Sequence, residues 1–417
     1  MQEKDFFRVV SVREFLDLVL LFPPIERTET VHPAQAAGRI LAQEVVAPED
    51  LPPASRSSMD GYAVRAADTF GAGEGSPAYL ETVGEIEVDT VPGFALRSGE
   101  CASIVTGGTL PEGADSVVMV EYTLEMGGGT VEVRKGVAPG ENMMLQGEDC
   151  VQGSTMFPAG KRLGIGDIGL LAALGMDRVT VYEQPKVFIV STGNELVPAH
   201  VTPRPGQIRD VNSTALAAQV ALFGGIPIQG ALIPDDLDRI SDELHKGVEQ
   251  ADLVLVSGGS SVGTRDLTLA AIEQLPEASV LAHGVAIKPG KPAILARVGT
   301  TPVWGLPGQV TSAQVSMLVF GLPLIRRLGG ERVSPDTGLL QQSAAVLARN
   351  ISSPQGKTEY VRVKLESGPD PLPRAVPILG KSGLLKTMVQ ADGMVEVGAN
   401  REGLEAGETV RVLVFPK

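Results

Sequence analysis

Three glycine-containing turns carry the residue types in this 417-residue chain that are best suited to binding an anion. They are STGNEL at 191–196, SGGSSVGTRD at 257–266 and LPGQVTS at 306–312. The first two each follow an apolar run that predicts a buried strand. The second and third turns lead into predicted helices, whose N-termini expose backbone N–H groups that can bind an oxyanion. Because the carboxyl ends of parallel strands meet at one sheet edge, we expect one anion site there. The candidate binding residues in the last two turns are Ser257, Gly258, Gly259, Ser261, Gly263, Pro307 and Gly308.

Carboxylates and lysines occur in the same part of the chain. Glu195, Asp235 and Asp266 stand near the ends of predicted elements, and a few such oxygens beside phosphate are the ligands that Mg²⁺ takes. Taken singly, each is also explained as a helix cap or a surface acid. KPGKP places Lys288 and Lys291 on either side of a Pro-Gly turn, which can direct both ammonium groups toward phosphate. The alternative is a solvated loop with two exposed lysines.

Three other motif types, a P-loop, a zinc site and a serine hydrolase nucleophile, are not supported by the sequence. GKS at 380–382 lacks the earlier glycine of a phosphate-binding P-loop, because Ala375 stands there. The chain has no HExxH, and its four histidines show no metal-ligand spacing. GSSVG at 259–263 fits the GxSxG pattern of a serine hydrolase with Ser261 as nucleophile. Asp266 is too close in sequence to Ser261 to arrive from a later strand, so we rank this function last.

The elements that must position these groups alternate between strand and helix from Lys186 to Gly330. KVFIVSTG, PIQGALI and DLVLVSGG predict strands, whereas STALAAQVALFGG, DLDRISDELHKGVEQA and RDLTLAAIEQL predict helices. TSAQVSMLVFGLPLIRRL predicts one long apolar helix. Such alternation predicts a parallel sheet that is covered on both faces.

Short alternating runs between glycine and proline turns predict two small β domains elsewhere in the chain. Apolar residues at helical spacing in 12–21, in 33–45 and again in 165–174 predict helices on both sides of the first small β domain. We therefore expect this β domain to be an insertion between helices. The expected fold is α/β plus β, with a central α/β domain and a C-terminal β-barrel-like domain. The expected domains are a helical linking domain (1–50 and 157–183), an inserted small β domain (51–156), the α/β domain (184–330) and the C-terminal β domain (331–417).

Composition limits the partners that we expect. The net charge of −15 argues against a general nucleic-acid or anionic-membrane surface, since both need dense Lys and Arg. No stretch reaches the roughly 18 uninterrupted apolar residues of a membrane span. With only Cys101 and Cys150, and no signal-peptide pattern in MQEKDFFRVV, we expect a reduced cytoplasmic protein. An anionic substrate would need a local cluster of cations.

Eight motifs, occurring in order, resemble those of a known family. They are MDGYAV at Met59, TGGTLPEGADSVVMVE at Thr106, GENMMLQGED at Gly140, STGNEL, SGGSSVG, KPGKP, TEYVRVKL at Thr358 and GKSGLL at Gly380. Together they resemble the molybdopterin molybdenumtransferases, the MoeA and gephyrin E-domain family. The resemblance covers nearly the whole chain.

The resemblance implies an elongated, four-domain homodimer whose active cleft is shared between subunits. It implies adenylylated molybdopterin and molybdate as substrates, release of AMP, Mg²⁺ as cofactor, and contact with molybdopterin adenylyltransferase. Glu195, Asp235 and Asp266 would serve Mg²⁺ and the adenylyl phosphates. Asp60 and Thr106 would form part of the cleft wall. Lys288, Lys291 and Pro292 would face the pterin phosphate or molybdate, and Arg362 and Ser382 would help to hold the oxyanion.

The chain departs from the family pattern at the nucleotide edge of this site. Gln309 and Val310 stand where the family has Asn and Pro, which relaxes the backbone at the start of a helix. Ser260 replaces a valine, and Leu267 replaces a common aromatic residue. A second hypothesis is therefore a divergent paralogue that binds molybdopterin for delivery or regulation without turnover.

Overall fold

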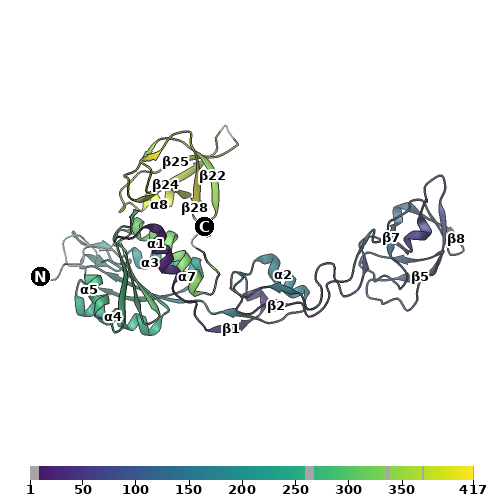
Figure 1. The fold of residues 1–417 in the computed structure, drawn as a ribbon, viewed down its shortest axis with the longest axis horizontal. Coiled ribbons are helices and arrows are strands. Elements are labelled where there is room, and N and C mark those ends of the chain that lie inside the picture. Colours follow the sequence, from purple (N-terminus) through teal and green to yellow (C-terminus); the bar gives the residue numbers. More distant parts are fainter. Residues whose placement is uncertain (1–8, 259–266, 335–337, 369–370, 417) are drawn as a thin grey trace.

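The computed structural model describes residues 9–258, 267–334, 338–368 and 371–416. Figure 1 shows an elongated molecule, with the α/β domain and the C-terminal barrel at one end and the small β domain at the other. The expected fold class, a central α/β domain with an inserted small β domain and a barrel-like C-terminal domain, is confirmed.

The central domain is built on a six-stranded sheet. Four neighbouring strands of this sheet are parallel, as predicted. The other two strands lie at one edge, and each pairs antiparallel with the strand before it in the sheet. The strands in spatial order are β16 (Ile226–Ile233), β13 (Lys186–Thr192), β17 (Leu253–Ser257), β21 (Thr301–Leu306), β20 (Ile294–Val298) and β18 (Ala278–His283).

Helices cover both faces of this sheet, which explains why its inner strands β13, β17 and β21 are buried almost throughout. Val187 and Ile189 of β13 belong to one hydrophobic core, and Phe188 and Val190 belong to a second core on the opposite face. The helices are α3 (Asn212–Phe223), α4 (Leu237–Gln250), α5 (Leu267–Glu273), α6 (Val310–Ser316) and α7 (Leu322–Leu328). A π-helical turn, Met317–Gly321, joins α6 to α7 just before Pro323, which has no N–H for a regular helical bond.

Helix α1 (Val12–Leu20) packs on the central domain, although the sequence analysis placed it in the linking domain. Ser11 and Glu14 form a capping box that fixes its start. Phe15 is fully buried, and its ring centroid lies 4.5 Å from Phe320 and 5.9 Å from Trp304. This aromatic cluster ties the first helix to β21 and the π turn.

The predicted helix over 33–45 is wrong. Only a 3₁₀ turn, Pro33–Gln35, forms there, and the chain then bends at Gly38, whose φ is +76°. Strands on the two sides of the insertion pair instead: β1 (Thr28–Val31) with β12 (Val179–Tyr182), and β2 (Val45–Val46) with β11 (Thr155–Phe157). Helix α2 (Ile165–Ala173) packs on this linking segment.

The small β domain is a six-stranded sheet with the order β7-β4-β6-β5-β9-β8. Its strands are β4 (Gly61–Val64), β5 (Ala78–Ile86), β6 (Glu100–Ile104), β7 (Ser116–Met119), β8 (Thr123–Gly127) and β9 (Thr130–Val133). A two-stranded pair, β3 (Arg56–Ser57) with β10 (Met143–Met144), adjoins the linking segment.

The C-terminal domain is a closed five-stranded barrel, because each of its strands pairs with two neighbours around a ring. The strands around the ring are β24 (Thr358–Glu366), β25 (Arg374–Pro377), β22 (Gln342–Leu347), β28 (Thr409–Val414) and β26 (Gly393–Val397). A short helix, α8 (Lys386–Gln390), follows the loop after β25. Strand β19 (Ile287–Lys288) of the central domain pairs with β24, which joins the two domains.

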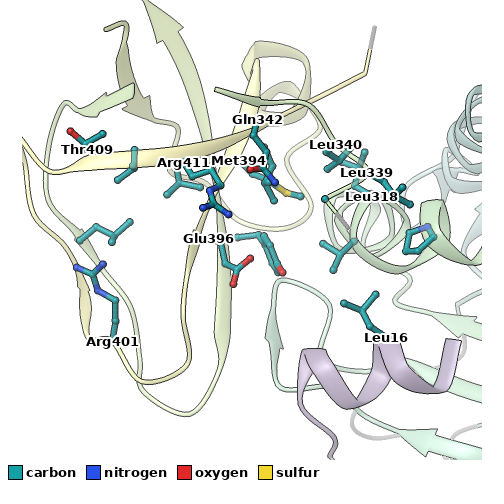
Figure 2. A pocket seen from close by; sticks show the side chains of 18 of the residues that line it. Leu16, Leu318, Leu339, Leu340, Gln342, Met394, Glu396, Arg401, Thr409 and Arg411 are labelled. Atoms are coloured by element: carbon teal, nitrogen blue, oxygen red, sulfur yellow. The ribbon is translucent and has the colours of Figure 1, made fainter. Parts of the chain in front are cut away.

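A cavity of about 490 Å³ lies between the barrel and the helices of the central domain. Figure 2 shows Leu16 of α1 and Leu318 of the π turn on one side, and Met394, Glu396 and Arg411 of the barrel on the other. None of the described residues that the sequence assigned to the site lines this cavity. Within the described ranges, no helix has the length and apolar character needed to cross a membrane.

Candidate functional site

The predicted turns meet at one edge of the central sheet. Ser191 of β13 is in register with Ser257 of β17, which in turn is in register with Leu306 of β21. The turns that follow these strands therefore leave the sheet side by side.

Glycine is required where two of these turns approach each other. Gly258 has a φ of +118°, and a Cβ built on it would lie 2.1 Å from the carbonyl oxygen of Thr192. A Cβ on Gly308 would lie 3.5 Å from Cα of Gly258. Pro307 is buried beside it. The predicted residues Ser257, Gly258, Pro307 and Gly308 thus form one compact backbone surface.

Asn212 joins the same two turns, and sequence reasoning missed it. Its Nδ2 donates to Ser257 Oγ at 2.6 Å and to the carbonyl oxygen of Gly308 at 2.8 Å. Asp210 supports this arrangement, because its Oδ1 accepts from Ser191 Oγ at 3.1 Å. The only signal in the sequence was a cluster of polar residues before a helix, which is also typical of an ordinary N-cap.

The two described carboxylates of the predicted metal group lie on neighbouring turns. Asn194 Oδ1 accepts from the backbone N–H of Asp235 at 3.1 Å, which ties the turn carrying Glu195 to the turn carrying Asp235. Both carboxylates are exposed. Over the ranges that the structure describes, no group of three or more His, Cys, Asp or Glu side chains could hold a metal ion. Asp266, like Gly259, Ser261 and Gly263, lies outside the described residues.

The Pro-Gly turn at 288–292 is held between helix α6 and the barrel. A Cβ on Gly290, whose φ is +121°, would lie 2.6 Å from Ser316 Oγ, so the turn rests directly on α6. Lys288 Nζ lies 2.8 Å from Glu359 Oε1 of strand β24. The carbonyl oxygen of Lys291 accepts from the backbone N–H groups of Val285 and Ala293, both at 2.9 Å. Both lysines are exposed, and Pro292 is half-buried.

The barrel brings a loop to the N-terminus of α6. The backbone N–H of Thr311 donates to the carbonyl oxygen of Ser382 at 3.2 Å. Arg362, which is only 7% exposed, donates from Nη2 to the carbonyl oxygen of Gly380 at 3.1 Å. Burial lowers the pKa of Arg362, and the nearby carboxylate of Glu359 opposes that effect. Arg362 and Ser382 therefore lie close to the carboxyl edge of the central sheet.

Several buried polar atoms around this edge have no hydrogen-bond partner among the described residues. They are Thr192 Oγ1, Asn212 Oδ1, Thr311 Oγ1, Ser316 Oγ and Arg362 Nε. A buried polar atom without a partner carries a desolvation cost of about 1–3 kcal/mol, so a cluster of them is expected where a polar ligand binds. Hydroxyl, amide and guanidinium groups together suit an oxyanion.

Asp60 and Thr106 lie far from this edge in the same chain. They are in the small β domain, at the opposite end of the molecule (Figure 1). Asp60 Oδ1 accepts from the backbone N–H and the hydroxyl of Thr106, at 2.6 and 2.8 Å. These two hydrogen bonds, the backbone one foremost, lower the pKa of Asp60. A single chain therefore presents two separate groups of predicted site residues.

Family models match three stretches of the chain. Residues 10–175 match the MoeA N-terminal region (domain I and II). Residues 188–327 match a probable molybdopterin binding domain. Residues 344–415 match the MoeA C-terminal region (domain IV).

Individual relatives match over nearly their whole length. A molybdopterin molybdenumtransferase of Bacillus subtilis is 31% identical over 97% of this chain and 94% of its own. Molybdopterin molybdenumtransferase 2 of Mycobacterium tuberculosis (strain ATCC 25618 / H37Rv) is 33% identical over 96% and 98%. The crystal structure of a molybdopterin biosynthesis MoeA protein from Pyrococcus horikoshii OT3 has a TM-score of 0.83 at 30% identity, and the match covers 98% of this chain and 100% of that one.

Proposed function

This chain belongs to the MoeA family, and we propose that it is a molybdopterin molybdenumtransferase of molybdenum cofactor biosynthesis. The relatives of that name support the activity, because they align with nearly the whole of this chain and of their own. The observation that carries the proposal is the set of buried, unpartnered polar atoms at the carboxyl edge of the central sheet.

We propose adenylylated molybdopterin and molybdate as the substrates. Ser257, Gly258 and the turn at Pro307–Gly308 would hold the nucleotide part, because a turn of this kind can approach a phosphate closely. Lys288 and Lys291 would bind the pterin phosphate or molybdate as point charges. Molybdate is a tetrahedral dianion, and Arg362 with the Ser382 hydroxyl would complete its binding.

The reaction that fits these groups needs no nucleophile from the protein. A water oxygen or a molybdate oxygen would attack the pterin phosphorus of the phosphoanhydride, the bond from that phosphorus to the bridging oxygen would break, and AMP would leave with the bridging oxygen. The two dithiolene sulfurs would replace two molybdate oxygens on molybdenum, and those oxygens would leave as water. The lysines and Arg362 would stabilise the negative charge that develops on the phosphate oxygens.

Mg²⁺ is the cofactor that we propose. The carboxylates of Glu195 and Asp235 fit it chemically, since Mg²⁺ takes one or two carboxylates together with substrate phosphate oxygens and water. Asp266 is the third proposed ligand. When bound, the ion would neutralise charge on the phosphoanhydride.

A homodimer with a shared site would unite the two groups of residues that one chain keeps apart. Asp60 and Thr106 of one copy would form the wall of the cleft whose floor is the sheet edge of the other copy. We further propose a cytoplasmic location and contact with molybdopterin adenylyltransferase, which would supply the adenylylated substrate.

The alternative is a paralogue that binds molybdopterin without turnover. One observation favours it: Gln309, at the N-cap of α6, forms no side-chain capping bond, so no side chain caps the helix at the nucleotide edge. The test is to incubate purified protein with Mg²⁺, molybdate and adenylylated molybdopterin and to measure AMP. Molybdate-dependent AMP release supports the transferase. Binding of the pterin nucleotide without AMP release eliminates the transferase in favour of the paralogue.

A further inference from the structure

We infer that two exposed loops, one from each copy of the chain, dock on each other and close the shared site. The tip loop is residues 85–91 of the small β domain, starting with the last two residues of β5, and the barrel loop is residues 379–389 of the C-terminal domain, including most of α8. The inference rests on the proposed function, because it takes the shared site as its starting point. It adds the surface that holds the two halves of the site together.

The tip loop lies beside Asp60 and Thr106. Strands β5 and β6 are parallel, with Ile86 in register with Ile104, so the segments that follow them leave from the same end of the sheet. A Cβ on Gly107, next to Thr106, would lie 3.6 Å from Val88 Cγ1. Val88 and Val91 are nevertheless 61% and 84% exposed. Two large apolar side chains thus stand uncovered next to the proposed cleft wall.

The barrel loop lies beside the sheet edge of the central domain. Ser382 of this loop accepts the hydrogen bond from Thr311 at the start of α6. The loop has a defined shape, because a Cβ on Gly380 would lie 2.7 Å from Thr387 Cγ2 and the N–H of Leu384 donates to Lys381. Four of its apolar side chains are exposed. Leu379 is 67%, Leu384 52%, Leu385 36% and Val389 83% exposed.

The two loops carry opposite charges. The tip loop has Glu85, Glu87 and Asp89, and the barrel loop has Lys381 and Lys386. Across the described ranges, none of these five side chains forms an ion pair. Exposed apolar groups flanked by unpaired opposite charges are typical of surfaces that bind each other.

The docking must join two copies, because the loops cannot meet within one. The small β domain and the barrel lie at opposite ends of the long axis (Figure 1). If Asp60 and Thr106 of one copy reach the sheet edge of a second copy, the tip loop beside them lies close to the second copy's barrel loop, which contains Ser382. The apolar side chains would then cover one another, and the acidic and basic groups would pair.

Disulfide cross-linking between two singly substituted chains tests the contact. Val88→Cys and Leu384→Cys proteins are mixed, allowed to exchange subunits so that mixed dimers form, and then mildly oxidised. The native thiols do not interfere, since Cys101 and Cys150 are buried. We expect a cross-linked heterodimer whose yield rises with molybdate and adenylylated molybdopterin. The matched control pairs Leu384→Cys with Ile165→Cys on α2, which is 90% exposed, and should not cross-link.

Charge reversal gives an independent readout. Glu87→Lys with Asp89→Lys, or Lys381→Glu with Lys386→Glu, should each lower the rate of AMP release per enzyme about tenfold, because like charges would then face each other. Combining the four changes should restore most of that loss, as expected of a direct coupling. If the protein is dimeric by sedimentation and releases AMP, but the cysteine pair does not cross-link and the four combined changes do not restore the rate, then the docking of the two loops is wrong and the proposed function stands. A monomeric protein that releases no AMP overturns the proposed function as well.

Discussion

Lys288 and Glu359 form an ion pair, with Nζ 2.8 Å from Oε1, that links the Pro-Gly turn of the central domain to the barrel. The pair continues the β19–β24 pairing, in which the same two residues are in register. Glu359 is largely buried and also accepts a hydrogen bond from Ser353 Oγ at 2.8 Å. One carboxylate therefore fixes the position of a lysine that the proposed function assigns to the oxyanion.

Glu359→Gln should weaken molybdate binding without unfolding the protein. Losing the ion pair leaves the Lys288 ammonium without its fixed position, and we expect the KM for molybdate to rise about three- to tenfold with a smaller change in kcat. Stability should fall by no more than about 1 kcal/mol, because Lys288 is half exposed. The matched control is Glu366→Gln, which breaks the exposed Lys364–Glu366 pair on the same strand. An unchanged KM in Glu359→Gln would contradict the positioning role.

Lys291→Ala should abolish transfer while the fold survives. An exposed lysine contributes less than about 0.5 kcal/mol to stability, but a cation on a developing negative charge contributes roughly 100-fold or more to rate. AMP release and thermal unfolding are the two measurements. Lys364→Ala, which removes an exposed lysine from the barrel, is the control and should retain activity. If Lys291→Ala is as active as the parent, its assigned role is wrong.

Periodicity predicted β13, β16 and β17 of the central sheet but not β18, β20 or β21, and the sheet brings the predicted turns to one edge. Val187 and Ile189 face one core while Phe188 and Val190 face the other, which is the burial pattern that a continuous apolar run indicates. The same reasoning failed at 33–45, where helical spacing of apolar residues is overridden by pairing with a segment more than 100 residues away. Pairing partners at that distance leave no local signal.

Side-chain hydrogen bonds between distant segments could not be predicted from the sequence either. Asn212 reaches Ser257 and Gly308, which are 45 and 96 positions away, and nothing near Asn212 indicates either partner. Placing Asp60 and Thr106 in a cleft wall came from family resemblance, because composition and spacing alone assign them no role. The distance between them and the sheet edge became evident only from the fold.

Thr106→Val should raise the pKa of Asp60. The folded-state pKa lies below the ordinary value of 3.8 because the Thr106 N–H and hydroxyl both donate to the carboxylate. The stabilisation is therefore present above that ordinary value and is lost as pH falls through the folded-state pKa. Valine keeps the N–H and removes the hydroxyl, so part of the shift should remain. Carboxyl NMR titration of the parent and the variant measures both pKa values, and equal values would rule out a role for the hydroxyl.

Gly258→Ala should damage both the site and the fold. A methyl group would lie 2.1 Å from the Thr192 carbonyl oxygen, and alanine disfavours a φ of +118°, so β13 and β17 must separate at their ends. We expect a stability loss of about 1–3 kcal/mol and a loss of nucleotide affinity. Gly166→Ala in α2 is the matched control, because nothing lies within 4 Å of its added Cβ. That change should stabilise the protein by about 0.5–1 kcal/mol, since alanine is the better helix former. Chemical denaturation and AMP binding, measured on both variants, separate a local effect at the sheet edge from a general effect of replacing glycine.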